Sequence, residues 1–143
     1  MITELYVPRE RLSAFMGDVR SDFLRYPVDL IYGTIRLSEA DTESALPWAR
    51  EPYACVVFNL HVDHHAAAIL DAATAFIRLI DHAIAHRGSY YLTYHRFARP
   101  DQLLRCHPRI RQWLAAKHRS DPTGVFQSDW YRSLPSISGE GVL

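Results

Sequence analysis

The order of extended and helical segments constrains this fold most. Four stretches rich in β-branched and aromatic residues alternate with two segments whose apolar residues recur at helical spacing. The predicted elements are a strand at 4–8, a helix at 9–26, strands at 28–37 and 53–62, a helix at 66–86 and a strand at 88–97. This order predicts an α+β fold of the ferredoxin-like βαββαβ type, with a four-stranded antiparallel sheet, both helices on one face and further helices at the C-terminus.

Both predicted helices carry one apolar stripe, which marks the side that packs on the sheet. Gly88 follows the second helix and is expected to close it. One or two further helices are expected at 100–122, before a tail that contains Trp130 and Tyr131. The stripes consist of Leu12, Phe15, Met16, Val19 and Phe23 in the first helix, and Ile69, Ala73, Phe76, Ile80 and Ala83 in the second.

Length and composition describe one globular domain over residues 1–143. Hydrophobic residues make up 48% of the chain, which excludes a disordered protein. Sixteen basic residues balance sixteen acidic ones, so nothing favours nucleic acid or an anionic membrane as partner. No apolar run approaches the roughly 20 residues of a membrane span, and the N-terminus does not resemble a signal peptide. With only Cys55 and Cys106, we expect a cytoplasmic protein without a disulfide framework.

Strand alternation predicts which side chains lie on the face that the helices leave open. In the second strand, Ile31, Ile35 and Leu37 are expected under the helices, with Tyr32, Thr34 and Arg36 on the other face. In the third, Val56, Phe58, Leu60 and Val62 are expected under the helices, opposite Cys55, Val57, Asn59 and His61. In the fourth, Tyr91, Thr93 and His95 alternate with Tyr90, Leu92 and Tyr94.

Pairing of the second and third strands would bring Arg36, Thr34, Asn59 and His61 together. An open sheet face is often polar simply because water wets it. Such a face usually carries Lys, Glu and Thr, whereas this one carries Arg, Asn, His and Tyr, the residue types that orient a ligand. Both interpretations stay open on pattern alone.

Two stretches resemble a known family: "GSYYLTYHRF" (88–97) and "CHPRIRQWLAAKHRSDPTGVFQSDWYRSL" (106–134). The most specific part is the spacing of Lys117, Asp121, Pro122 and Phe126, followed by "SDW". "IYGTIRL" and "VVFNLHV" add a looser likeness. Together they resemble the C-terminal substrate domain of FAD-linked oxidases of the vanillyl-alcohol-oxidase superfamily, in the branch of aldonolactone and alditol oxidases and decaprenylphosphoryl-ribose oxidase.

The resemblance implies a role for each matching position. Arg36 matches the arginine that stabilises a developing alkoxide, and Asn59 and His61 match polar positions that contact the substrate. His95 falls where relatives have a catalytic lysine, so either His95 or His61 is expected to take the hydroxyl proton. We expect Thr34, Tyr32, Tyr91 and Thr93 to bind substrate hydroxyls.

The resemblance also implies FAD, which such enzymes bind mainly through a separate module. The six glycines are scattered and form no phosphate-binding loop. We therefore expect an FAD-binding domain or subunit as partner, a small alcohol, sugar or aldonolactone as substrate, and no activity of this chain alone.

Two alternatives remain open. In the first alternative, the chain is a freestanding ferredoxin-like module that forms a homodimer through its open face. The third possibility is a metal enzyme using "HVDHH" (61–65), although Asp63 and the histidines at a strand-to-helix junction more often cap the helix. His82 and His86 are expected to be exposed rather than metal ligands, and both cysteines to be buried. We therefore predict no metal.

Overall fold

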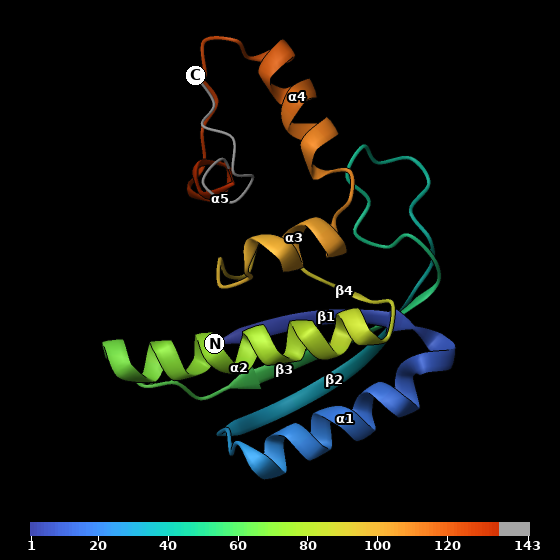
Figure 1. The fold of residues 1–143 in the computed structure, drawn as a ribbon, viewed down its shortest axis with the longest axis vertical. Helices are drawn as coiled ribbons and strands as arrows, with labels where there is room; N and C mark the ends of the chain where they lie inside the picture. Colours follow the sequence, from blue (N-terminus) through green and yellow to red (C-terminus); the bar gives the residue numbers. More distant parts are fainter. Residues whose placement is uncertain (135–143) are drawn as a thin grey trace.

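The computed structural model describes residues 1–134. In that range the chain order matches the predicted alternation of strands and helices, followed by three C-terminal helices (Figure 1). The elements are β1 (Ile2–Pro8), the 3-10 turn η1 (Arg9–Arg11), α1 (Leu12–Arg25), β2 (Leu30–Ser38), β3 (Tyr53–Leu60), α2 (Ala66–Ala85), β4 (Ser89–Tyr90), α3 (Pro100–Cys106), α4 (Ile110–Ser120) and α5 (Asp129–Ser133).

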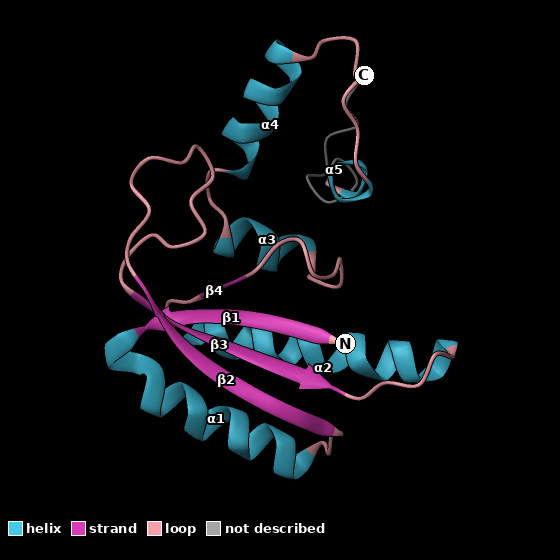
Figure 2. Cartoon of the chain, turned by 180° about the vertical axis from the view of Figure 1, so that it is seen from behind, coloured by secondary structure: helices cyan, strands magenta, loops and turns pink. Residues whose placement is uncertain are grey.

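The strands form one antiparallel sheet in the order β2-β3-β1-β4. The two central strands are the most apolar and are almost entirely buried. Helices α1 and α2 lie on one side of this sheet, and α3, α4 and α5 lie beyond the β4 edge (Figures 1 and 2). The predicted α+β class and four-stranded antiparallel sheet are confirmed.

The main core lies between the sheet and the two long helices. Alternate residues of the central strands enter it, among them Leu5, Val56 and Phe58, and meet Phe15 of α1 and Phe76 of α2. Most of the predicted helical stripes is buried there, which confirms them, but Ile69 lies near the exposed start of α2 and is itself exposed. Among residues 1–134, no helix is both long enough and apolar enough to span a membrane.

The predicted fourth strand at 88–97 is wrong beyond Tyr90. Tyr91 N–H still donates to the Glu4 carbonyl at 2.9 Å, and residues 92 and 93 then form a turn. The His95 ring contacts the Thr3 hydroxyl and stacks on Phe76. These contacts draw the chain toward the helices instead of along β1, so the fourth strand ends early at this edge and the sheet is not a regular ferredoxin-like one.

The expectation that the apolar residues of β2 lie under the helices is also wrong. Ile31, Ile35 and Leu37 are 57%, 51% and 67% exposed. Helices α1 and α2 pack on the central part of the sheet, where they contact β1, and leave β2 as an exposed edge.

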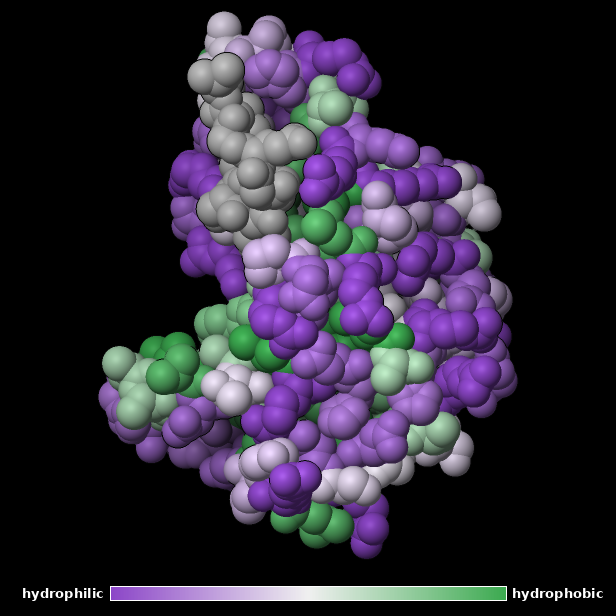
Figure 3. Space-filling model, viewed as in Figure 1, coloured by the Kyte–Doolittle hydropathy of each residue, from purple (hydrophilic) through white to green (hydrophobic). Residues whose placement is uncertain are grey.

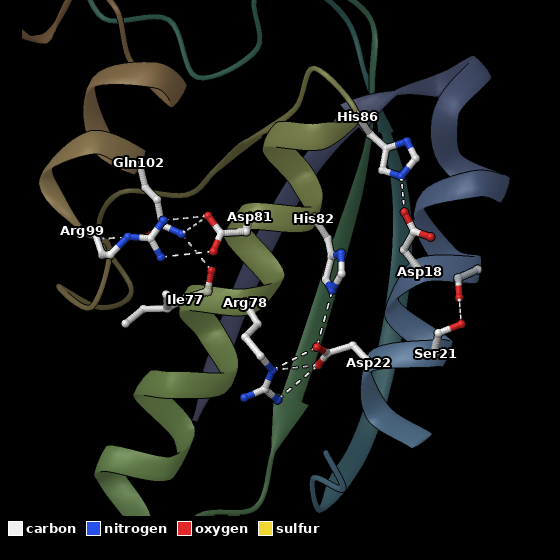
Figure 4. A network of polar contacts seen from close by, with 11 residues as sticks. Asp18, Ser21, Asp22, Ile77, Arg78, Asp81, His82, His86, Arg99 and Gln102 are labelled. Carbon is white, nitrogen blue, oxygen red and sulfur yellow. Dashed lines mark hydrogen bonds and ion pairs between the residues drawn. The ribbon is translucent and has the colours of Figure 1, made fainter. Parts of the chain in front are cut away.

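Hydrogen bonds and ion pairs between charged side chains connect the helices to one another (Figure 4). Arg78 of α2 donates from Nε to the Asp22 carboxylate of α1 at 2.9 Å and from Nη2 at 3.1 Å. His82 and His86 pair with Asp22 and Asp18, so these histidines bridge two helices rather than facing water as expected. The predicted exposure of both histidines is therefore corrected.

Helix α3 is attached to α2 on the other side of the same network. The Arg99 guanidinium pairs with Asp81 at 2.9 and 3.1 Å, and the Gln102 amide donates to Asp81 and to the Ile77 carbonyl, both at 2.8 Å. These contacts place α3, and with it the segment after β4, against the middle of α2 (Figure 4).

Gly88 is needed for close packing rather than for a left-handed cap. The left-handed position after α2 is taken by Arg87, with φ 61°. A Cβ at Gly88 would lie 2.1 Å from the Tyr6 carbonyl oxygen and 2.7 Å from that of Ala83. Only glycine therefore lets the chain pass between α2 and β1 into β4.

Gly88→Ala should lower the free energy of unfolding by about 3 kcal/mol or more, because both clashing atoms belong to the backbone. Gly17→Ala, in α1, is the matched control, since nothing lies within 4 Å of a Cβ there. It should raise stability by about 1 kcal/mol through helix propensity. Urea denaturation of both variants measures these changes, and equal effects would contradict the packing role of Gly88.

Candidate functional site

Strand register assembles the polar residues of the sheet on the face opposite α1 and α2, which we call the open face. Across the sheet, Arg36 lies beside Cys55, and Cys55 beside Tyr6. In the next row Thr34 lies beside Val57, and Val57 beside Glu4. Tyr32 pairs with Asn59 one row further. The observed register places Tyr32, Thr34, Arg36 and Asn59 on one face, whereas His61, which was predicted to join Arg36, lies beyond the end of β3.

The Glu4 carboxylate is the centre of this face. Its side chain is 10% exposed. Oε1 accepts a hydrogen bond from the Tyr6 hydroxyl at 2.9 Å and one from Cys55 Sγ at 2.8 Å, while Oε2 lies 3.7 Å from Nη2 of Arg36. A carboxylate that loses most of its water needs such donors and a nearby cation. Three strands thus converge on one anion.

The donors around Glu4 keep their protons at neutral pH. Burial, followed by the hydrogen bond to Glu4 and its charge, raises the pKa of Cys55 to about 12. Burial and the same carboxylate raise the pKa of Tyr6 as well. Because a cysteine nucleophile needs the thiolate form, Cys55 acts here as a hydrogen-bond donor. The predicted burial of both cysteines is confirmed.

One end of the open face is covered and the other is exposed. The loop between β2 and β3 places Trp48 against Tyr6, with ring centroids 4.9 Å apart, and buries Ala49 and Tyr53. Arg36, by contrast, has a side chain that is 64% exposed, and Tyr32 and Thr34 are exposed beside it. The guanidinium therefore has a buried anion behind it and solvent in front.

Two tyrosines close the β4 side of this face. Tyr91 packs against the small cluster of Tyr6 and Cys55, and its ring meets that of Tyr94 edge-on at 4.7 Å. Partial burial raises the pKa of Tyr94, and the charge of Glu4 and a hydrogen bond to Glu4 raise it further. The expectation that Tyr94 points away from Tyr91 is therefore wrong, because the strand ends before it.

His95 lies on the helix side of the sheet. Its Nε2 is 3.1 Å from the Thr3 hydroxyl, and its ring stacks on Phe76 and Phe97. Burial lowers its pKa to about 4. These are the surroundings of a core residue, and they give no support to the predicted catalytic role. Thr93, also predicted to bind substrate, is exposed in the turn after β4.

His61 is also separate from Arg36. Its Nδ1 lies 2.9 Å from Asp29 Oδ2, just beyond the end of β3. It lines a cleft of about 480 Å³ between the end of α1 and the start of α2, together with Arg25, Tyr26 and Asp71. The structure therefore brings four of the predicted residues together with Tyr91 nearby, and leaves His61, Thr93 and His95 elsewhere.

The Lys117–Phe126 spacing builds a local turn. The Asp121 carboxylate accepts from Lys117 Nζ and from the backbone N–H groups of Val125 and Phe126, at 2.9 and 3.0 Å. The bond from Lys117 needs a lysine one helical turn before the aspartate. The most specific part of the family resemblance is thus explained here by a structural role at the end of α4.

No metal centre forms among residues 1–134, where no three His, Cys, Asp or Glu side chains gather closely enough to hold an ion. In the "HVDHH" segment, His65 Nδ1 instead accepts from Ala68 N–H at 3.2 Å and caps α2. This is the capping alternative that the sequence left open.

Sequence reasoning missed Glu4 and Tyr94. An acidic residue inside an otherwise apolar segment, "ELYVP", was a usable signal, because a charge on a central strand needs partners. Tyr94 left no such signal, since its position depends on where β4 ends.

The comparisons with known proteins add no relative. The chain matches no known protein family, and no curated protein is similar to it in sequence. The resemblance to FAD-linked oxidases therefore stays a prediction, carried by the residues quoted above.

The buried histidines predict a specific pH dependence. Burial lowers the pKa of His95 and of His107 to about 4, whereas the unfolded value is about 6.5. The unfolded state then binds more protons between these values. Stability should be full above about pH 6.5 and fall toward pH 4, by up to about 3 kcal/mol for each ring. Urea denaturation across this range measures the slope.

His95→Phe should remove about one proton from that slope, whereas His64→Gln, at an exposed position, should leave it unchanged. A His95→Phe slope equal to that of the wild type would mean that His95 is not held neutral in the folded protein.

Proposed function

We propose that this chain is the substrate-side domain of an FAD-dependent oxidoreductase that oxidises an alcohol, sugar or aldonolactone. In this proposal the open face forms one wall of the active site, and a flavin-binding domain or subunit forms the other. The same proposal includes a ferredoxin-like fold for the sheet and its two long helices. The observation that carries it is the Arg36 guanidinium, exposed on the open face and backed by the buried Glu4 carboxylate.

Arg36 has the surroundings that alkoxide stabilisation needs. It is a cation on β2, with the hydroxyls of Thr34 and Tyr32 and the amide of Asn59 in the neighbouring rows. Such groups, placed before the reaction, stabilise negative charge that develops on a substrate oxygen. Glu4 acts through the position of Arg36, since its own oxygens already accept from Tyr6 and Cys55.

The open face is suited to lie against a flat partner. Its exposed part carries the aromatic rings of Tyr32 and Tyr94 beside the charge of Arg36. When bound by its own module, FAD would supply the acceptor for the substrate hydride. The residues of this chain would orient the hydroxyl groups and stabilise the oxygen. A proton-accepting role for His61 or His95 gains no support from their positions.

The alternative of a module that buries its open face against a second copy has less support. The apolar side chains that such an interface favours lie along the β2 edge, whereas the exposed part of the open face is mainly polar and aromatic.

Fusion to the flavin-binding module of an alditol oxidase tests the proposal. Sugar alcohols and aldonolactones, added without oxygen, should bleach the oxidised-flavin absorption band. Arg36→Ala should slow this reduction on the order of 10²–10³, the loss typical of one charge-stabilising donor. Arg87→Ala, which breaks an exposed ion pair with Glu10, is the matched control and should leave the rate unchanged. Equal rates in all three proteins would remove Arg36 from the site.

A further inference from the structure

The β2 strand is an unprotected sheet edge. Within residues 1–134 it lies at the end of the strand order and pairs only with β3, so one row of its backbone groups has no sheet partner in that range. Natural edge strands usually carry Lys, Pro or inward-pointing charges, which prevent pairing with other chains. Over nine residues, LIYGTIRLS, β2 has one charged side chain, Arg36, and no proline.

The same edge exposes apolar side chains. Leu30 and Tyr32 are exposed along with Ile31, Ile35 and Leu37, although water disfavours such a row. No other strand in residues 1–134 is exposed along its length in this way. A second strand that pairs with the β2 backbone and covers these side chains would account for both the unpaired edge and the exposed apolar row.

The β2 sequence is complementary to itself. An antiparallel pair of two β2 strands centred on Thr34 uses all nine residues, with the irregularity between Leu30 and Tyr32 at each end of the pair. Leu37 then lies opposite Ile31 of the second copy, and Ile35 opposite Gly33. Arg36 lies opposite Tyr32, where a guanidinium has a favourable contact with the ring.

Charge favours this register over a pair centred on Arg36. With Thr34 at the centre, the two Arg36 side chains are offset by four residues, about 13 Å along the strands, which exceeds the roughly 8 Å screening length of physiological salt. A pair centred on Arg36 would place two guanidinium groups face to face. The pair centred on Thr34 therefore keeps the guanidinium groups apart and uses the full length of the strand.

We propose that two copies of this chain pair through β2, antiparallel and centred on Thr34, into a continuous eight-stranded sheet. This dimer extends the sheet sideways and does not cover the open face. The dimer proposal depends only on the β2 edge, and it does not depend on whether the chain acts together with a flavin-binding partner. It also differs from the homodimer that the sequence left open, which buries the open face.

Sedimentation of charge variants tests the pairing. The wild type should have twice the mass of one chain. Leu37→Lys combined with Ile31→Lys places like charges opposite each other at both ends and should yield a monomer. Leu37→Lys combined with Ile31→Glu places opposite charges there and should restore the dimer. Both side chains involved are solvent-exposed, so the fold should tolerate each change.

Leu70→Lys is the control, at an apolar patch over the N-terminal part of α2 that lies away from the β2 edge (Figure 3). It should leave the mass unchanged. A monomeric wild type, or a dimer that survives the paired lysines, would overturn the proposal. So would equal masses of the two double variants, because only pairing in this register distinguishes them.

A cross-link tests the register independently. Thr34→Cys places two sulfurs on the symmetry axis, at strand-pair separations that a disulfide spans. Mild oxidation should give a covalent dimer, because the native cysteines are buried and contribute no background. Leu70→Cys should stay uncross-linked. Equal cross-linking of both variants would contradict the register.

Discussion

The carboxylate of Glu4 is the constraint on which the open face depends. It lies on a central strand, where a charge is costly, and accepts from Tyr6 and Cys55 while facing Arg36. Because these partners come from β1, β3 and β2, the carboxylate links three strands at one point. Removal of the charge would leave Arg36 without its anion and Cys55 and Tyr6 without an acceptor. The polarity that makes this face suited to a ligand is thus also part of how the sheet is held.

The two sides of the sheet have different tasks. The helix side carries the main core, and even its histidines serve packing, as His95 does between Phe76 and Phe97. The open side is covered at one end by Trp48 and Tyr53 and exposed at the other. The β2 edge is a third surface, which is apolar and has no strand partner among residues 1–134. A second copy at the edge would therefore share Tyr32, Thr34 and Arg36 with a ligand on the open face.

Much of this arrangement could be predicted from periodicity. The helical stripes of α1 and α2 and the alternation in β3 are local patterns, and they located the core and the residues of the open face. The end of β4 was not predictable in this way, because it depends on a contact between His95 and Thr3, far apart in sequence. The exposure of Ile35 and Leu37 has a similar cause. Alternation tells which face a residue points to, but not how far a helix covers an edge strand. The prediction that His95 is catalytic assumed a longer β4 strand than the structure has.

A titration of the isotope-labelled chain with an alditol and an aldonolactone, followed through its backbone amide NMR signals, tests the central claim most directly. The account predicts shifts at Tyr32, Thr34, Arg36 and Asn59, and weaker shifts in Glu4→Gln, where Arg36 loses the anion behind it. Shifts confined to the cleft near His61 and Arg25, or no shifts at all, would contradict the claim that the open face is where this protein meets its substrate.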